Sequence, residues 1–575
     1  MYCQTHHGSW IGRGVYRRAN DGLPFLAYLF PDAAVPPSSD GRLAALDALG
    51  TAMIAQAPDP AEGSTTPPVF TFLGQFIDHD IAAVADLGPQ ANGVEDAAPR
   101  DRARVERDLV NFRDGRLDLG SLYGGGMAAF ATDEADRAFL AKMKDLLRFP
   151  EDPSRMWVAF YDGEAEGRPG DPRAVVDLPA DRAGDLLRLG RLLEGPNPLV
   201  TQAELAALSP ELGKTFLRDG TPMTARAVLG DLRNDDNLAL AQLHLAFLRL
   251  HNGVAEARKA QRRHDGLPHD PEVVFTWAQR RVRWIYQWLV VNVFLPRICD
   301  PERLAHVIAS EAEVYRDFLA RLGWAGGPLP LPLEFAAAAF RYSHATVRAS
   351  YDWNPFFGRA ADGKDNRLPE APLRELDRLT GNGGLGGRDR LPGHWGADWA
   401  RMIGAPGGHD GWMARRIGPR LALPLGRLDG SDDPNLARRH LRLGHRLNLP
   451  SAQDCIAALR RYDADLPTLP EARLGQGAAG LALEAGGMIG ATPLWYYVLR
   501  EAEALERGER LGPLGTHLVA GTLLGLIVSD EASYWNQMGS DRGRWCPSDL
   551  GVDGLPALDD LAPILEFAGL YIRRD

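Results

Sequence analysis

Four polar side chains interrupt the apolar stretch at residues 70–85, which reads FTFLGQFIDHDIAAVA. Its apolar residues face nearly every side, so we predict a buried helix. Gln75, Asp78 and His79 share one face, whereas Asp80 lies about 100° further round. Buried polar groups need partners, so the shared face is expected to border a polar or cofactor-filled cavity, with Asp80 directed to a second site. An imidazole there is suited to general acid–base chemistry.

The simpler interpretation of this stretch is a core histidine held by a neighbouring carboxylate. Buried polar groups are usually satisfied in that way. Four polar groups within six residues make this interpretation less favoured than a functional site.

A cation and a carboxylate stand immediately before a second predicted helix, which runs from Asn237 to Ala260. Arg233 and Asp236 are three residues apart and can point the same way. An arginine beside a buried histidine can stabilise developing negative charge. The alternative is an acidic cluster that caps the helix, since Asp and Asn favour N-cap positions. The helix also carries His244 and His251, which we expect to be packed structural residues.

A single histidine, His344, stands in the Ala-rich stretch from Pro332 to Tyr351. The alanines and periodic aromatic residues predict a buried helix. A neutral imidazole on such a helix is a good axial ligand for haem iron. Arg341, one turn earlier, could pair with a haem propionate.

The segment DGRLDLGSLYGGG, residues 114–126, carries two carboxylates in a turn-rich context. Asp114 and Asp118, together with backbone carbonyls, suit a hard cation that takes several oxygen ligands. The alternative is a turn followed by a short strand or helix.

Two of these motifs resemble those of one family, the animal-type haem peroxidases of the peroxidase–cyclooxygenase superfamily. GQFIDHD resembles the family's distal-histidine helix, and FRYSH resembles its proximal-histidine motif. The resemblance covers roughly residues 70–530, with both motifs in the family's order. It implies that haem b lies between His79 and His344, that His344 binds the iron, and that His79, Arg233 and Gln75 are the catalytic residues.

The resemblance also implies how the haem is held. Asp78 and Asp236 occupy the positions at which the family forms ester links to haem methyl groups, although Asp236 is one methylene shorter than the family's Glu. Asn237 replaces the Met that forms a sulfonium link in some members, so no such link is expected. His440 stands where the family has an Asn that accepts a hydrogen bond from the proximal histidine.

Calcium is the second cofactor that the resemblance implies. Asp80, Asp114, Asp118 and the backbone carbonyl of Arg116 match positions of the family's calcium loop. Gly120 stands where the family has a Ser, so one ligand is missing.

The function predicted from these motifs is that of a haem peroxidase, with a role in the response to oxidative stress. Its partners would be hydrogen peroxide and a small electron donor such as a halide, thiocyanate or a phenol. The related fatty-acid dioxygenases place a radical Tyr three residues before the proximal histidine. Here that position is Arg341 and the tyrosine is Tyr342, which favours the peroxidase branch. A dioxygenase, a non-catalytic haem-binding protein and a helical scaffold without haem remain as alternatives.

Composition limits the remaining possibilities. The chain has 575 residues and a formal net charge of −12, which argues against nucleic acid as a partner. Its four cysteines are far apart and form no metal-binding pair, so we expect free thiols. No apolar signal core opens the chain, and no apolar run is long enough to span a bilayer. We therefore expect a cytoplasmic protein or one exported without a Sec-type signal.

The overall organisation follows from the periodic patterns. We predict a mainly α fold with few or no strands. Residues 1–65 are expected to form an irregular N-terminal arm, and residues 66–575 a single large helical domain that carries the catalytic site.

Overall fold

The computed structural model describes residues 26–36, 40–55, 63–86, 98–161, 183–358, 370–405, 412–428, 433–552 and 554–572. Within these ranges the chain is mainly α-helical, and strands occur only in five two-stranded sheets. The predicted mainly α fold with few strands is confirmed. The short sheets pair β1 (Leu26–Ala27) with β8 (Leu331–Pro332), β2 (Val84–Asp86) with β3 (Leu109–Asn111), β4 (Val158–Ala159) with β5 (Asp185–Leu186), β6 (Leu217–Arg218) with β7 (Thr221–Pro222), and β9 (Ser350–Tyr351) with β10 (Ala371–Pro372).

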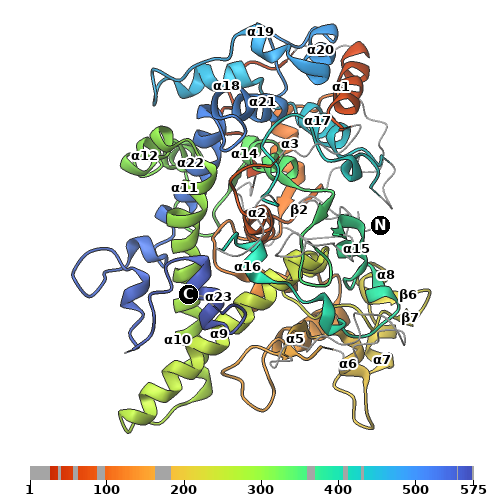
Figure 1. Ribbon diagram of the computed structural model, residues 1–575, viewed down its shortest axis with the longest axis vertical. Coiled ribbons are helices and arrows are strands. Elements are labelled where there is room, and N and C mark those ends of the chain that lie inside the picture. Colours follow the sequence, from red (N-terminus) through yellow and green to blue (C-terminus); the bar gives the residue numbers. More distant parts are fainter. Residues whose placement is uncertain are drawn as a thin grey trace.

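Helix α2, Val69–Ile81, lies near the middle of the molecule (Figure 1). It packs against α9 (Leu238–His264) and the 3₁₀ helix η6 (Ala339–Thr346). The helix ends four residues before the predicted boundary at Ala85. The Asn111 side chain explains this, because it donates to the Ile81 carbonyl at 2.8 Å and accepts from the Ala83 N–H at 2.7 Å. These bonds replace the next helical turn and lead the chain into β2.

Helices α9 and α10 (Pro271–Leu289) form a long antiparallel pair that runs towards the lower left of Figure 1. Asn237 caps α9 by accepting from the Leu240 N–H at 2.9 Å. Helix α10 continues through a π-helical turn, Val290–Phe294, into α11, Leu295–Ile298.

The stretch expected to form one buried helix around His344 is broken in two. It forms α14, Leu333–Ala337, and then η6, with Ala338 at φ −136° and ψ −71° between them. Side chains satisfy the carbonyls that the break exposes: Arg341 Nε donates to Ala336 at 3.1 Å, and Trp495 Nε1 donates to Arg341 at 3.2 Å. Such distant partners are invisible to a periodicity argument, which is why the predicted continuous helix is wrong.

The segment expected to be an irregular arm contains a helix. Helix α1, Asp40–Ala52, packs on α17 (Leu436–Arg446) and α20 (Gly477–Ala485). Leu46 and Leu49 are buried and lie three residues apart, so they supply its apolar face, and the buried Met53 follows directly after the helix. The expectation of irregular structure is therefore wrong for this stretch, while the division of the chain near residue 65 stays a prediction.

The remaining α-helices of the described residues are α3 (Arg102–Asp108), α4 (Gly120–Tyr123), α5 (Glu134–Asp145), α6 (Leu189–Leu193), α7 (Gln202–Ala206), α8 (Pro210–Phe216), α12 (Pro301–Ala309), α13 (Glu313–Arg321), α15 (Leu373–Arg378), α16 (Trp399–Met402), α18 (Ala452–Leu459), α19 (Glu471–Leu474), α21 (Leu494–Glu506), α22 (Pro513–Ser529) and α23 (Leu561–Phe567). Across the described ranges, none of the helices has the length and apolarity needed to cross a bilayer. The described cysteines, Cys299, Cys455 and Cys546, are free thiols.

Candidate active site

His79 lies at the end of α2 and is buried. Its Nδ1 is 2.9 Å from Asn234 Oδ1, and Asn234 Nδ2 is 3.0 Å from His244 Nδ1. An amide oxygen only accepts, so Nδ1 of His79 carries the proton and Nε2 is the bare nitrogen. Burial, and next the charge of Arg233, lower the pKa of His79 to about 3. The ring is therefore a neutral base with a defined tautomer.

Arg233 lies beside His79, but most of its guanidinium is already engaged. It forms an ion pair with Asp231 at 2.6 Å and donates to the carbonyls of His79 at 3.0 Å and Ala82 at 2.8 Å. Burial alone would lower the pKa of Arg233, but Asp231 holds it above the usual value. Its Nη1 has no hydrogen-bond partner within the described residues. Arg233 thus fixes the end of α2 and keeps one nitrogen for another ligand.

Gln75 and His79 are four residues apart on α2 and share a face, and the Asp236 N–H donates to the Arg233 carbonyl at 3.1 Å. Asn237 Nδ2 donates to Gln75 Oε1 at 3.1 Å, while Gln75 Nε2 is buried and has no partner in the described part of the chain. Asp236 is buried and accepts from Asn382 Nδ2. Burial raises the pKa of Asp236 well above the usual value, so the structure favours a neutral carboxyl there.

Asp78 is half-buried on the face of α2 that it shares with Gln75. Its negative charge raises the pKa of Arg233 and also that of Arg341, where it opposes the larger effect of burial. The Asp78 carboxylate therefore lies within electrostatic reach of one arginine near His79 and one near His344.

The second histidine, His344, lies in η6 against His440 of α17. Its Nδ1 is 3.1 Å from His440 Nε2 and 3.1 Å from the Arg341 carbonyl. Burial, followed by the charges of Arg341 and Arg439, lowers the pKa of His344 to about 3, so the ring is neutral. The Arg341 guanidinium lies 3.3 Å from His440 Nδ1, and its Nη2 has no partner among the described residues.

The elements that carry the two histidines are in direct contact. Thr71 Oγ1 of α2 is 2.8 Å from Thr346 Oγ1 of η6. A Cβ at Gly74 would lie 3.8 Å from the Ser343 Cβ, so the two backbones approach closely at this point. The structure thus brings His79 and His344 onto neighbouring elements although they are 265 positions apart (344 − 79) in the sequence.

The predicted calcium ligands are only partly assembled. Asp80 is buried and accepts from the N–H groups of Leu119 at 3.0 Å and Ser121 at 3.1 Å. Burial, and next the charge of Asp118, raise the pKa of Asp80 to about 7. Asp114 is turned towards Arg116, with which it forms an ion pair.

No three acidic, histidine or cysteine side chains in the described ranges gather closely enough to form a metal site. A cation at this point would depend on backbone carbonyls in addition to Asp80 and Asp118. Ser121 Oγ is buried beside Asp80 and has no partner among the residues described, so it is a further oxygen that a cation could use.

Two residues of the site were not identified from the sequence. Asn234 orients His79, and Asp231 binds both Arg233 and Arg113, the latter at 2.6 Å. Both flank Arg233 in the run DLRND, so their position beside the predicted catalytic arginine was the available signal. His244 is a packed residue, as predicted, but it also fixes the Asn234 amide.

The fold and the site together define a class of protein. It is a mainly helical protein in which a buried histidine, His79, and a half-buried one, His344, are both neutral and lie on touching elements, with arginine and carboxyl groups nearby.

Comparisons with known proteins connect this class to a family. Residues 201–373 match the family model described as animal haem peroxidase, a range that includes Arg233 and His344. A peroxidase-like protein of Margaritifera margaritifera is 25% identical over 292 residues, which are 50% of this chain and 32% of that protein. Thyroid peroxidase of Mus musculus is 29% identical over 192 residues, 31% of this chain and 18% of that protein. The matches span less than a third of each relative.

Solved structures share the fold over almost the whole chain. Peroxidase A of Dictyostelium discoideum has a TM-score of 0.52 at 14% identity and covers 96% of this chain and 94% of its own. A fatty acid α-dioxygenase of Arabidopsis thaliana has a TM-score of 0.53 at 12% identity, with 96% and 78% covered. The resemblance drawn from the two histidine motifs is confirmed at this level: residues 201–373 match animal haem peroxidase, and the fold is the one found in peroxidase A and the fatty acid α-dioxygenase.

Proposed function

We propose that this protein is a haem peroxidase that reduces hydrogen peroxide with electrons from a small donor such as a halide, thiocyanate or a phenol. The observation that carries the proposal is the hydrogen-bond chain from His79 through Asn234 to His244, which leaves His79 Nε2 as a bare, neutral base. A peroxide molecule must lose a proton to be cleaved, and this nitrogen can accept it.

The residues present fit a haem. Haem carries carboxylates and an iron that takes a neutral imidazole, and it supplies the redox chemistry that reduces peroxide. His344 would bind the iron through Nε2. Gln75, Arg233 and Arg341 each have one buried side-chain nitrogen without a hydrogen-bond acceptor in the described part of the chain, so each can donate to a bound haem or its ligand. Arg439 adds a fourth such nitrogen, near His344.

Each residue near His79 has a separate task. Arg233 donates to the carbonyl of His79 and so fixes the position of that histidine. The Nη1 of Arg233 can stabilise the negative charge that develops on a departing oxygen. Gln75 can hold a water or a halide through Nε2. Asp78 and Asp236 are the candidate ester positions, and the neutral carboxyl favoured at Asp236 suits a group that loses its charge on esterification.

Calcium belongs to the same proposal as a structural cofactor. A cation held by Asp80 and Asp118 would relieve the repulsion that raises the pKa of Asp80. Because Asp80 directly follows His79, it would also fix the end of α2.

The dioxygenase alternative is less favoured by the geometry around His344. The position three residues earlier is Arg341, whose guanidinium lies against His440 and the Ala336 carbonyl, so no phenol is available there to form a radical. Tyr342 is buried next to Phe340, with ring centroids 6.3 Å apart.

The test is a haem titration followed by peroxide assays. Wild type should bind haem with a Soret band and oxidise iodide or a phenol only when peroxide is present, whereas His344→Ala should lose most of the band. His517→Ala is the control, because His517 of α22 is a buried histidine that pairs with Asp463 at 2.8 Å. Normal haem binding by His344→Ala would contradict the assignment. Oxygen uptake with palmitate but no peroxide-dependent oxidation would favour the dioxygenase.

A further inference from the structure

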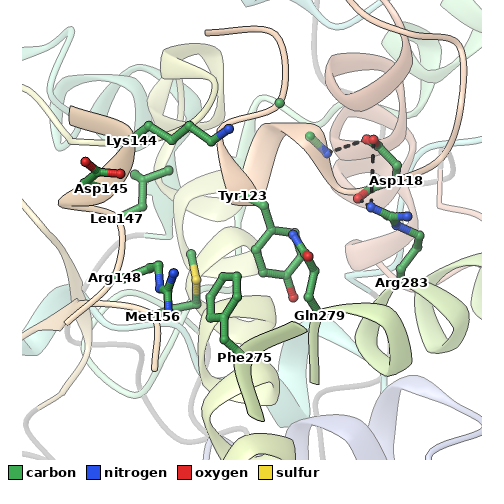
Figure 2. Close-up of a pocket in the computed structure, with 12 residues that line it drawn as sticks. Asp118, Tyr123, Lys144, Asp145, Leu147, Arg148, Met156, Phe275, Gln279 and Arg283 are labelled. Atoms are coloured by element: carbon green, nitrogen blue, oxygen red, sulfur yellow. Dashed lines mark hydrogen bonds and ion pairs between the residues drawn. The ribbon is translucent and has the colours of Figure 1, made fainter. Parts of the chain in front are cut away.

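A pocket of about 290 Å³ lies outside the site of His79 and His344, between α4, α5 and α10. Its wall includes Tyr123, the last residue of α4, and Phe275 of α10. Figure 2 shows these two rings side by side, with Gln279 next to Tyr123 and Lys144 across the opening. No residue that we place at the haem lines this pocket.

Tyr123 is hydrogen-bonded to a buried histidine whose tautomer is fixed. His251 Nε2 lies 3.1 Å from the Ser154 carbonyl, which only accepts, so Nε2 carries the proton. Its Nδ1 is therefore an acceptor, and the Tyr123 hydroxyl donates to it at 3.0 Å. Burial lowers the pKa of His251 to about 4 and raises that of Tyr123, so both rings are neutral. The pair consists of a phenol with a base already in place for its proton.

Aromatic rings and one turn of α9 lie between this pair and α2. Tyr123 and His251 both contact Phe275, with centroids 5.9 and 4.9 Å away. One turn before His251 on α9 is Phe247, which lies on the same face because four residues separate them. Phe247 stacks on Phe76 of α2 at 4.9 Å.

Phe76, the last of these rings, lies close to the site around His79. Phe76 lies three residues before His79 on α2, and its ring also contacts that of His244 at 6.1 Å. His244 in turn is bonded to Asn234, the residue that orients His79. Packed rings, together with the turn of α9 from Phe247 to His251, thus lie between the pocket wall and the residues around the predicted haem.

We propose that Tyr123 is a second oxidation site, at which a single-ring phenol in the pocket gives up an electron without entering the haem cavity. This inference rests on the proposed peroxidase function, because a haem oxidised by peroxide is the oxidant. In the step, Tyr123 loses one electron to the oxidised haem, and its hydroxyl proton moves to His251 Nδ1. The resulting tyrosyl radical takes one electron from the bound phenol, and the proton returns from His251 to Tyr123. The phenol leaves as a phenoxyl radical after releasing its own proton to water.

The pocket chemistry suits a phenol. Leu147, Met156 and Phe275 provide apolar wall for one ring, and Gln279 and Lys144 provide polar groups for its hydroxyl. The volume is at the lower end of the range for ligand sites, which favours a single ring. Arg148 lies over the Phe275 ring at 4.0 Å and is held by Glu272, so it closes one side rather than binding the donor.

The first experiment uses the haem-loaded protein, one equivalent of peroxide and rapid freezing for electron paramagnetic resonance. Wild type should show a tyrosyl radical signal that Tyr123→Phe lacks. The matched control is Tyr315→Phe, because Tyr315 is also buried but donates to the Pro330 carbonyl at 2.8 Å, and no histidine among the described residues is its partner. The control should keep the signal. A signal of equal size and shape in Tyr123→Phe would overturn the proposal.

The second experiment compares donors. The ratio of phenol to iodide oxidation rates should fall about tenfold or more in Tyr123→Phe and stay unchanged in Tyr315→Phe. Gln279→Trp should fill the pocket, leaving the radical signal but lowering the same ratio. An unchanged ratio in both Tyr123→Phe and Gln279→Trp would overturn the proposal. If haem-loaded wild type does not react with peroxide, the proposed peroxidase function itself is overturned. That result is seen with wild type alone, so it is distinguished from a failure of the Tyr123 proposal, which is seen only in the variants.

Discussion

His440 Nε2 lies 3.1 Å from His344 Nδ1, and the Arg341 guanidinium lies 3.3 Å from His440 Nδ1 on the other side of the ring. The second contact disfavours the tautomer of His440 that could accept a proton from His344. An iron ligand at His344 Nε2 requires the proton on Nδ1. His440 can accept that proton only if its own proton sits on Nδ1, facing a group that only donates. The Arg341 carbonyl, also 3.1 Å away, is the acceptor without this conflict.

The first prediction concerns the replacement of His440. His440→Asn supplies an amide oxygen that accepts without conflict, so it should bind haem at least as tightly as wild type. His440→Ala removes the ring that holds His344 and should weaken haem binding by about tenfold to a hundredfold. Haem titration followed at the Soret band measures both. An alanine variant with wild-type affinity would show that Arg341 and packing alone orient His344.

The second prediction concerns the base at His79. His79→Ala should slow the reaction of the haem-loaded protein with peroxide by roughly two to four orders of magnitude, because no proton acceptor replaces Nε2. Asn234→Val should cause a smaller loss, since the base remains but its tautomer is no longer fixed. Stopped-flow absorbance measures the rates. Asn252→Val, which removes another buried amide that binds Met156 at 2.7 Å, is the control and should leave the rate unchanged.

The third prediction concerns Arg233. Arg233→Lys keeps a positive charge but cannot bind Asp231 and two carbonyls at once, so it should loosen the end of α2. We expect a slower peroxide reaction in Arg233→Lys and a further loss in Arg233→Ala, of roughly two to three orders of magnitude. Equal rates in wild type and Arg233→Ala would contradict a role in charge stabilisation. Haem content, measured in parallel, separates lost cofactor from slow chemistry.

The fourth prediction concerns calcium. A chelator should lower the thermal stability of wild type, and restoring calcium at about 100 times its dissociation constant should recover about 2.7 kcal/mol. Asp80→Asn should abolish the response. Asp114→Asn should reduce it less, because Asp114 is paired with Arg116. A wild type without bound calcium and indifferent to the chelator would remove calcium from the proposal.

The fifth prediction concerns covalent haem at Asp78. Peroxide treatment of the haem-loaded protein, followed by acid–organic extraction and mass spectrometry, should leave haem mass on a peptide that contains Asp78. Asp78→Asn should retain less, and Asp236→Asn should show whether a second ester forms. Complete extraction of haem from treated wild type would mean that Asp78 only pairs electrostatically with Arg233 and Arg341.

The pH dependence of stability tests the buried histidines in the haem-free protein. Burial lowers the pKa of His244 to about 3, whereas the unfolded value is about 6.5. Between these values the unfolded chain binds more protons, so this histidine lowers the free energy of unfolding as pH falls below about 6.5, by at most about 1.4 kcal/mol per pH unit. His244→Met should flatten the slope measured by denaturant unfolding at pH 7 and pH 5. The exposed His264 provides the control variant, His264→Asn.

The sequence by itself determined the elements and most of the candidate residues. The apolar pattern of α2, interrupted at Gln75, Asp78 and His79, is local information, and so is the single histidine of the FRYSH run. Both patterns depend on residues within a few turns of one another, where helical spacing fixes which side chains share a face. The mainly α class follows from the same periodicity.

The tertiary structure alone decided what each of those residues contacts. Asn234 reaches His79 across 155 positions, Asn111 ends α2, and Trp495 satisfies the broken turn at Arg341. A buried polar group takes whichever partner the packing brings near, and no sequence period encodes that partner. The same reason applies to the pair of Tyr123 and His251: from the sequence His251 is only a packed histidine, and the 3.0 Å contact alone makes the pair a phenol with its base.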